Sequence, residues 1–290
     1  MGKAARDAPA GFETLSLLPK LLPVYSQLLS ELKAAGAEWV QIDEPILVLD
    51  NAINFQSQYA SAYAELEKVS PKIILTTYFG RLENNLDFVS KLPVAGLHID
   101  LAREPAQLNA VIAAVKPTNL ILSLGLVNGR NIWKTDIAAA ITLARKAIEA
   151  LGADRVIVAT SSSLLHTPVT LASETQLTAE QKDWFSFATE KAAEVATIAA
   201  VLSGSTDAAV TAALEANKAS IAKRRAFEQN SDDSVRKRVA SITPEMLNRK
   251  NPFPIRREAQ KKNLNLPKFP TTTIGSFPVC LLYFIHSFLY

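Results

Sequence analysis

Two adjacent acids, Asp43 and Glu44, follow a short apolar run at residues 39–42 and precede Pro45. If that run is a parallel strand, both carboxylates stand at its carboxyl end, where α/β proteins assemble their sites. They could then bind a cation or an amino group. The structural alternative is that one acid caps the following segment and the other pairs with a nearby base, and the dipeptide alone favours this role.

Two further polar groups directly follow apolar runs. Arg130, next to Gly129, could donate two hydrogen bonds to a carboxylate or phosphate. The alternative is a turn in which Arg130 donates to neighbouring carbonyl groups and the Trp133 side chain is packed. Three serines at residues 161–163 precede His166, which suggests a nucleophile and its base, but no Gly-x-Ser-x-Gly elbow accompanies them. We therefore favour structural roles here too, with the serine hydroxyls closing a strand end.

Composition excludes several classes of site. Cys280 is the only cysteine among 290 residues, and the histidines are His98, His166 and His286, so neither a disulfide framework nor a cysteine-rich zinc site is possible. No phosphate-binding glycine motif occurs, which leaves nucleotide binding without support. Residues 223–268 hold thirteen Lys and Arg against five Asp and Glu. Because aromatic residues are not interleaved with these charges, we expect a solvated linker and no nucleic-acid partner.

Five short, almost continuously apolar runs predict strands that are buried on both faces. They are residues 39–42, 72–76, 96–100, 120–124 and 155–159. Segments of helical period lie between them, for example residues 108–115 and 137–151. The strand starts are about 24 to 35 residues apart, which predicts parallel βα units. Periodicity leaves open whether these units form a doubly wound sheet or part of a barrel.

The chain changes character after the last predicted strand. Residues 179–202 and 208–222 read as two helices, and the second leads into the basic stretch. Within that stretch, residues 231–234 and 251–254 carry the signals of a surface loop.

We expect a cytoplasmic protein that has no membrane partner. No apolar signal-peptide run follows Met1. The most apolar stretch, residues 279–290, falls well short of the roughly 20 residues that a spanning helix needs.

Four motifs, taken together, resemble a known family. They are Gln-Ile-Asp-Glu-Pro at 41–45, Asn-Gly-Arg-Asn-Ile-Trp at 128–133, Ser-Ser-Ser-Leu-Leu-His at 161–166, and the segment 264–278. In order and spacing they resemble cobalamin-independent methionine synthases. The resemblance implies two face-to-face (βα)8 TIM barrels that transfer a methyl group from 5-methyltetrahydropteroyltri-L-glutamate to homocysteine. It also implies zinc, bound in the C-terminal barrel, as the cofactor that holds the homocysteine sulfur, and no cobalamin.

Set against this pattern, the chain looks like a fragment. Residues 11–222 correspond to an incomplete N-terminal barrel, and residues 223–268 to a basic linker of helix and loop. Residues 269–290 correspond to the start of the C-terminal catalytic barrel, with its first strand, and depart from the family after residue 278. The family's zinc ligands, one His, one Glu and two Cys, lie beyond that point, so we expect neither a metal ligand nor a catalytic residue in this chain.

One binding element of the family has a counterpart here. Ile274, Gly275 and Ser276 match the family's Ile-Gly-Ser, which contacts the amino-acid part of homocysteine. A glycine-flanked strand end can offer N–H groups and a hydroxyl to a carboxylate. The alternative is that this segment only joins the linker to a strand.

The leading expectation is therefore a methyltransferase by descent, involved in methionine biosynthesis, whose isolated chain is inactive. Homocysteine and methylfolate polyglutamate are the substrates that the resemblance implies. The alternative is a non-enzymatic interaction fragment that binds a protein partner.

Overall fold

The computed structural model describes Pro9, residues 11–227 and residues 232–271. It divides into two compact units, Met1–Phe227 and Glu228–Tyr290, and each is described by itself. The predicted domain limits at residues 222 and 268 stay predictions.

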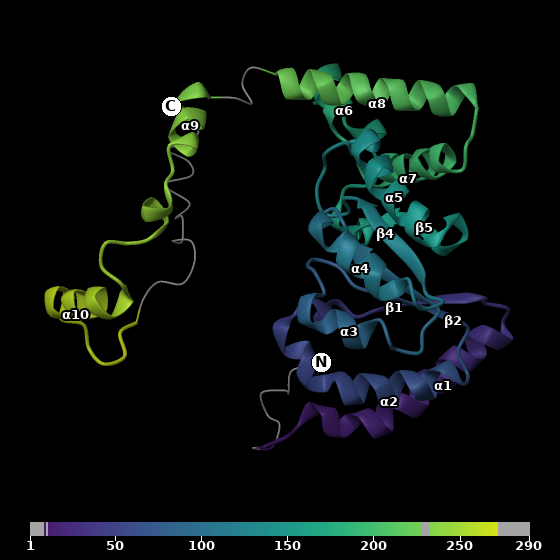
Figure 1. Cartoon of the computed structure of the whole chain (residues 1–290), viewed down its shortest axis with the longest axis horizontal. Coiled ribbons are helices and arrows are strands. Elements are labelled where there is room, and N and C mark those ends of the chain that lie inside the picture. The colour runs from purple at the N-terminus through teal and green to yellow at the C-terminus, as the bar shows by residue number, and fades with distance from the viewer. Residues whose placement is uncertain (1–8, 10, 228–231, 272–290) are drawn as a thin grey trace. The chain divides into compact units, whose positions relative to one another are not determined.

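The first unit is built on one parallel sheet. Its strands are β1 (Trp39–Asp43), β2 (Lys72–Thr76), β3 (Gly96–Asp100), β4 (Ile121–Val127) and β5 (Val156–Thr160). They follow one another in the sheet in chain order, and every neighbouring pair is parallel (Figure 1). A doubly wound sheet reverses its order at a switch point, whereas a barrel adds each strand beside the last. The α/β prediction is confirmed, and the winding is of the barrel type.

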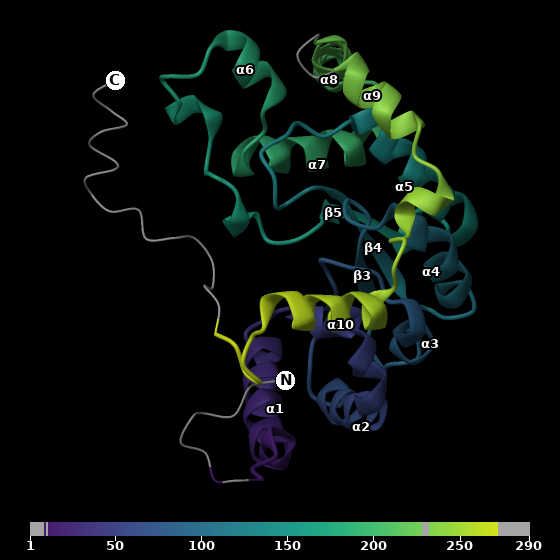
Figure 2. The ribbon, with the colours of Figure 1, turned by 90° about the vertical axis from the view of Figure 1, so that its left-hand side faces the viewer.

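Helices connect the strands and cover the sheet. They are α1 (Leu18–Ala34), α2 (Gln56–Glu67), α3 (Leu86–Val89), α4 (Leu108–Val115) and α5 (Ile137–Leu151), followed by α6 (Ala179–Trp184), α7 (Ala188–Leu202) and α8 (Ala208–Ala226). Figure 2 shows α2, α3, α4 and α5 in a row along one side of the sheet. This row covers the residues that face the helices, which are alternate residues of each strand.

The two faces of the sheet differ in character. Toward the helices, fully buried residues such as Leu97 on β3 and Leu124 on β4 form the core with apolar residues of α4 and α5. On the other face, Thr76, His98 and Ser123 stand at matching positions of β2, β3 and β4. All three are buried, so the middle of that face is polar and closed to solvent.

The predicted strands and helices hold in place, with three corrections. Burial on both faces is confirmed for β3 and β4 but is wrong for β1 and β5, the strands that pair on one side only and contain no buried residue. The fourth strand continues through Gly125 to Val127, past the predicted end at residue 124. Residues 179–202 form two helices, α6 and α7, because the chain between them turns away to pair with the loop after β4. There Phe185 forms an antiparallel bridge with Trp133, and the N–H of Ser186 donates to the carbonyl of Ile132 at 2.8 Å.

The second unit contains α9 (Asp233–Ala240) and α10 (Phe253–Leu264). Both helices begin at the positions that the sequence marked as loops. Asp232 caps α9 by accepting hydrogen bonds from the N–H groups of Ser234 and Val235, and Pro254 lies in the first turn of α10, where proline is tolerated. None of the described residues of this unit is buried. Ile274, Gly275, Ser276 and the segment 279–290 lie outside the described residues.

In the part of the chain that the structure describes, no helix combines the length and the apolar character needed to cross a bilayer.

Candidate functional site

The carboxyl ends of the five strands carry most of the polar residues that the sequence singled out. Because all strands are parallel, these ends meet at one edge of the sheet, the edge at which barrel proteins place their sites.

Asp43 and Glu44 both lie at this edge but have different surroundings. Asp43 is exposed, and its carboxylate accepts hydrogen bonds from Gln41 at 2.7 Å and from the Tyr78 hydroxyl at 3.3 Å. The Glu44 carboxylate accepts from the hydroxyls of Tyr59 and Tyr63, each at 3.2 Å. Among the described residues neither acid pairs with a base and neither caps the following turn. The predicted cap and the predicted ion pair were therefore wrong, and the acids bind hydroxyl and amide groups instead.

Glu44 lines a hollow of about 420 Å³ between α1, α2 and the end of β1. The walls are mostly leucine and tyrosine side chains, and burial raises the pKa of Glu44 above its ordinary value. The hydrogen bonds from Tyr59 and Tyr63 oppose this rise because they stabilise the ionised form. A carboxyl held in this way can exchange a proton nearer to neutral pH than a solvated one.

Phe79, just past β2, is a residue that the sequence did not reveal. Its φ of 73° lies in the left-handed region, which is unusual for a side chain of this size. The Asp100 carboxylate at the end of β3 holds this conformation by accepting the Phe79 N–H at 3.1 Å, and it also accepts the Arg103 N–H at 2.7 Å. The Phe79 ring is thereby fixed at the carboxyl edge, with the Tyr78 ring 4.5 Å away.

Arg130 stacks on that ring, with its guanidinium carbon 4.3 Å from the ring centre of Phe79. The ring of His166 meets the same ring edge-on at 5.8 Å. The predicted turn, in which Arg130 bonds neighbouring carbonyls, was therefore wrong. That role belongs to Arg155, whose guanidinium donates to the carbonyls of Val115 and Leu120. We call Tyr78, Phe79, Arg130 and His166 the arginine–aromatic cluster.

The three serines after β5 lie against the loops that carry Arg130 and His166. The Ser161 hydroxyl accepts the Gly129 N–H at 3.2 Å, and Ser163 caps the short turn that carries His166 by accepting the Leu165 N–H. Gly129 lies so close to Ser162 that an added Cβ would stand 2.5 Å from the Ser162 carbonyl oxygen. The Ser161 and Ser163 hydroxyls thus close a strand end, as predicted, whereas the Ser162 hydroxyl is buried without a hydrogen-bond partner among the described residues. The Ser161 bond and the contact of Ser162 with Gly129 fix the loop before Arg130.

Buried polar side chains of α7 and α8 hold the rest of the loop after β4. Asn217 donates to the Thr135 carbonyl at 2.8 Å and accepts the Ile137 N–H at 3.1 Å, while Lys191 donates to the Trp133 carbonyl at 3.0 Å. Burial lowers the pKa of Lys191, and the nearby charge of Glu194 opposes that change. We call Lys191, Glu194 and Asn217 the polar clamp.

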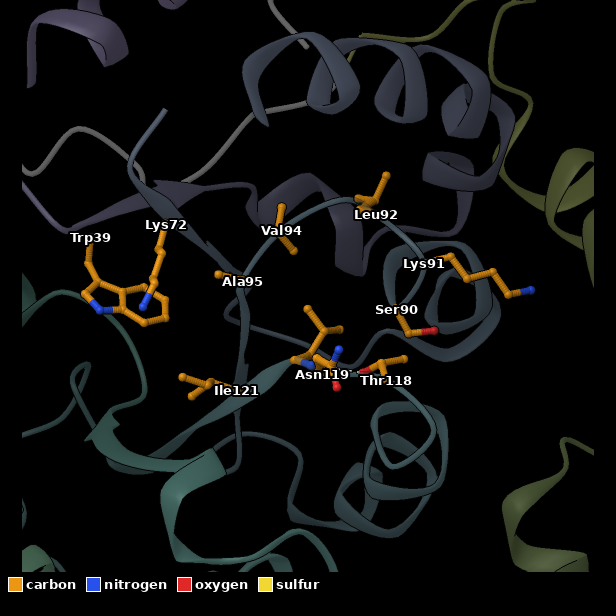
Figure 3. Close-up of a pocket in the computed structure, with 11 residues that line it drawn as sticks. Trp39, Lys72, Ser90, Lys91, Leu92, Val94, Ala95, Thr118, Asn119 and Ile121 are labelled. Atoms are coloured by element: carbon orange, nitrogen blue, oxygen red, sulfur yellow. Dashed lines mark hydrogen bonds between the residues drawn. The ribbon is translucent and has the colours of Figure 1, made fainter. Parts of the chain in front are cut away.

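The opposite end of the sheet carries a different surface. A hollow of about 600 Å³ lies at the amino ends of the strands. Trp39, Lys72 and Ile121 are among the residues that line it (Figure 3). The Lys72 ammonium lies 5.2 Å from the ring centre of Trp39. In barrels the amino ends of the strands serve stability rather than chemistry, and this hollow brings together no group of titratable side chains.

Zinc, which the resemblance implies, has no fitting site in what the structure describes. Within residues 11–227 and 232–271, no group of three or more His, Cys, Asp or Glu side chains could hold a metal ion.

A parallel, sequentially wound sheet with its polar residues at the carboxyl edge defines the chain as part of a barrel-type α/β protein. The family description "Cobalamin-independent synthase, N-terminal domain" matches residues 1–152. The chain belongs to this cobalamin-independent synthase family.

Relatives match nearly the whole chain. A 5-methyltetrahydropteroyltriglutamate–homocysteine methyltransferase from Candida albicans is 53% identical over 279 residues, which is 96% of this chain and 36% of that protein. The enzyme of the same name from Saccharomyces cerevisiae is 52% identical over 280 residues, with the same coverage. A solved B12-independent methionine synthase from Shewanella, in complex with selenomethionine, aligns at a TM-score of 0.48 and 14% identity, over 67% of this chain and 57% of that one. The chain spans about 36% of the length of the two yeast relatives.

Proposed function

We propose that this chain supplies part of the N-terminal domain of an enzyme that transfers a methyl group from 5-methyltetrahydropteroyltri-L-glutamate to homocysteine. The observation that carries the proposal is the 53% identity over 96% of the chain to a relative that bears this name. We propose the cytosol as its place of action.

The chain's own part in this reaction is structural. Its described side chains bind and orient the strand-end loops, and the Ser123 hydroxyl beside His98 Nδ1 is buried inside the sheet. The zinc of the whole enzyme belongs to residues beyond this chain, because Cys280 is the only cysteine here and the resemblance requires two. When bound, zinc would favour the thiolate of homocysteine, because an unbound thiol such as that of cysteine has a pKa of about 8.5 and is mostly protonated at neutral pH.

We further propose that Ile274, Gly275 and Ser276 contact the amino-acid end of homocysteine in the whole enzyme. Their support is the match to the family's Ile-Gly-Ser. A Ser276→Ala change there should raise the KM for homocysteine about tenfold, with a smaller effect on kcat, as for the loss of one hydrogen bond to a charged group.

The test is a chimera in which this chain's matched 279 residues replace their counterpart in the Candida relative. We expect the chimera to make methionine and to restore growth of a methionine-requiring strain. A well-folded chimera without activity would contradict the proposed function.

The isolated chain should make no methionine above the uncatalysed background, even with added zinc, because nucleophile activation and substrate positioning are both lost. Turnover by the isolated chain would show that the chemistry lies in this chain. A pull-down with the whole enzyme tests the interaction alternative: stable capture together with an inactive chimera would favour it.

A further inference from the structure

The arginine–aromatic cluster is a preformed arrangement. Phe79 is held in a sparsely populated backbone conformation by the Asp100 carboxylate, and such strain costs about 1–3 kcal/mol. In the loop after β4, Gly129 packs closely against Ser162, and its N–H donates to the Ser161 hydroxyl. The backbone N–H of Arg130 donates to the side-chain oxygen of Asn128 at 2.8 Å. The loop after β2 therefore fixes Phe79 and the loop after β4 fixes Arg130, each through its own hydrogen bonds.

The guanidinium carbon of Arg130 lies over the Phe79 ring, 4.3 Å from its centre. A guanidinium in contact with an aromatic ring can still donate its N–H groups to a ligand. The side chain is exposed, and within the described residues no carboxylate or carbonyl accepts from it. In contrast, Arg225 of the same unit bonds the Asp136 carboxylate at 2.7 Å, and Arg155 bonds carbonyls.

The charge around the cluster limits what it can bind. Asp43 reaches it through the Tyr78 hydroxyl and brings negative charge to the same edge. A phosphate dianion would meet this repulsion with one arginine and without a glycine-rich nest of N–H groups. A singly charged carboxylate is repelled less than a phosphate dianion, and one guanidinium can donate hydrogen bonds to both of its oxygens.

We propose that the arginine–aromatic cluster binds the carboxylate of a small organic acid. The carboxylate oxygens accept two N–H groups from Arg130, and the carbon part of the ligand packs on the exposed parts of Tyr78 and His166. This site is separate from the homocysteine contact and does not rest on the proposed methyl transfer.

The test is an NMR titration of the full chain with benzoate, following the backbone amides of Phe79, Gly129 and Arg130. We expect saturable shifts with a Kd on the order of 1 mM, as for a ligand of few heavy atoms. Arg130→Gln should raise the Kd at least tenfold. Arg130→Lys keeps the charge but cannot donate two parallel hydrogen bonds, and it should raise the Kd by a smaller factor. Arg145→Gln, an exposed change on α5, should leave it unchanged.

Three outcomes would overturn the proposal. One is the absence of saturable shifts in the unmodified chain, and another is an unchanged Kd in both Arg130 variants. The third is tighter binding of inorganic phosphate than of benzoate with the same loss in Arg130→Gln, which would make the site a phosphate site. Far-UV circular dichroism checks the fold of each variant, and Arg130→Lys decides the matter if Arg130→Gln does not fold.

Discussion

His98 is the residue whose burial has the clearest consequence for stability. It lies on β3 with Nδ1 2.9 Å from the Ser123 hydroxyl, and burial lowers its pKa to about 4 from 6.5. The backbone of Ser161 and the charge of Asp43 oppose this change only in part. The ring is therefore neutral in the folded chain across most of the range in which an exposed histidine becomes charged.

We expect His98 to make the chain acid-sensitive. Between pH 6.5 and pH 4 the unfolded chain binds more protons than the folded one, so the stability that His98 contributes is complete above about pH 6.5 and is lost as the pH falls toward 4. The loss from pH 8 to pH 5 should be about 2 kcal/mol. Urea unfolding of the unmodified chain and of His98→Gln at both pH values isolates the contribution of His98, because Glu44 and Asp100, whose pKa values burial raises, are present in both proteins.

His166→Gln, at the exposed histidine of the arginine–aromatic cluster, is the matched control and should keep the full pH dependence. An equal loss of stability in the chain with and without His98 would show that another group controls acid unfolding.

Gly129 is the residue at which a single methyl group should matter most. In Gly129→Ala the new Cβ would stand 2.5 Å from the Ser162 carbonyl oxygen and 2.7 Å from its hydroxyl, so the backbone of one loop must move. We expect a loss of about 1–3 kcal/mol in thermal or urea unfolding. Adding Ser162→Ala removes the hydroxyl but not the carbonyl, so it should restore little. Full rescue by that second change would show that the hydroxyl alone sets the limit.

At the scale of elements, the polar clamp decides where the chain after β4 runs. Asn217 accepts the buried N–H of Ile137 and donates to the half-buried carbonyl of Thr135, both in that segment. We expect Asn217→Ala to lower the free energy of unfolding by about 2–4 kcal/mol, because both backbone groups lose their partner. Lys218→Ala is the neighbouring control, since Lys218 makes only an exposed pair with Glu215. Similar unfolding curves for both variants would contradict the clamp.

The elements that the sequence predicted are those fixed by local pattern. All five strands fall on the apolar runs, although β1 and β5 contain no buried residue, and α4 and α5 end where the pattern ends. The break between α6 and α7 could not be predicted, because it depends on the pairing of Phe185 with Trp133, 52 residues away in the chain. The candidate site shows the same limit. Arg130 was found from its position after a strand, whereas Phe79 was missed because Asp100 imposes its conformation from the next strand.

At the scale of the whole first unit, α1 is the element whose exposed apolar residues form a stripe. Five of them at helical spacing, Leu21, Val24, Tyr25, Leu28 and Leu32, follow the exposed Leu17 just before the helix. Its inner face already packs on α2 through residues such as Leu29. Among the described strands, β1 and β5 each pair on one side only. Contiguous apolar surface and open strand edges are both features that promote association.

We therefore expect the chain to self-associate through the α1 stripe as its concentration rises. Val24 and Leu28 are 62% and 51% exposed, so changing both to Lys removes apolar surface without opening the core. Sedimentation velocity should show oligomers of the unmodified chain at tens of micromolar, and mainly monomer for the double variant. Lysine at Leu165 and Val169, which are 93% and 74% exposed but lie outside the stripe, is the matched control and should associate like the unmodified chain. If the α1 variant associates as strongly as the control, the open edges of β1 and β5 are the surfaces that hold the copies together.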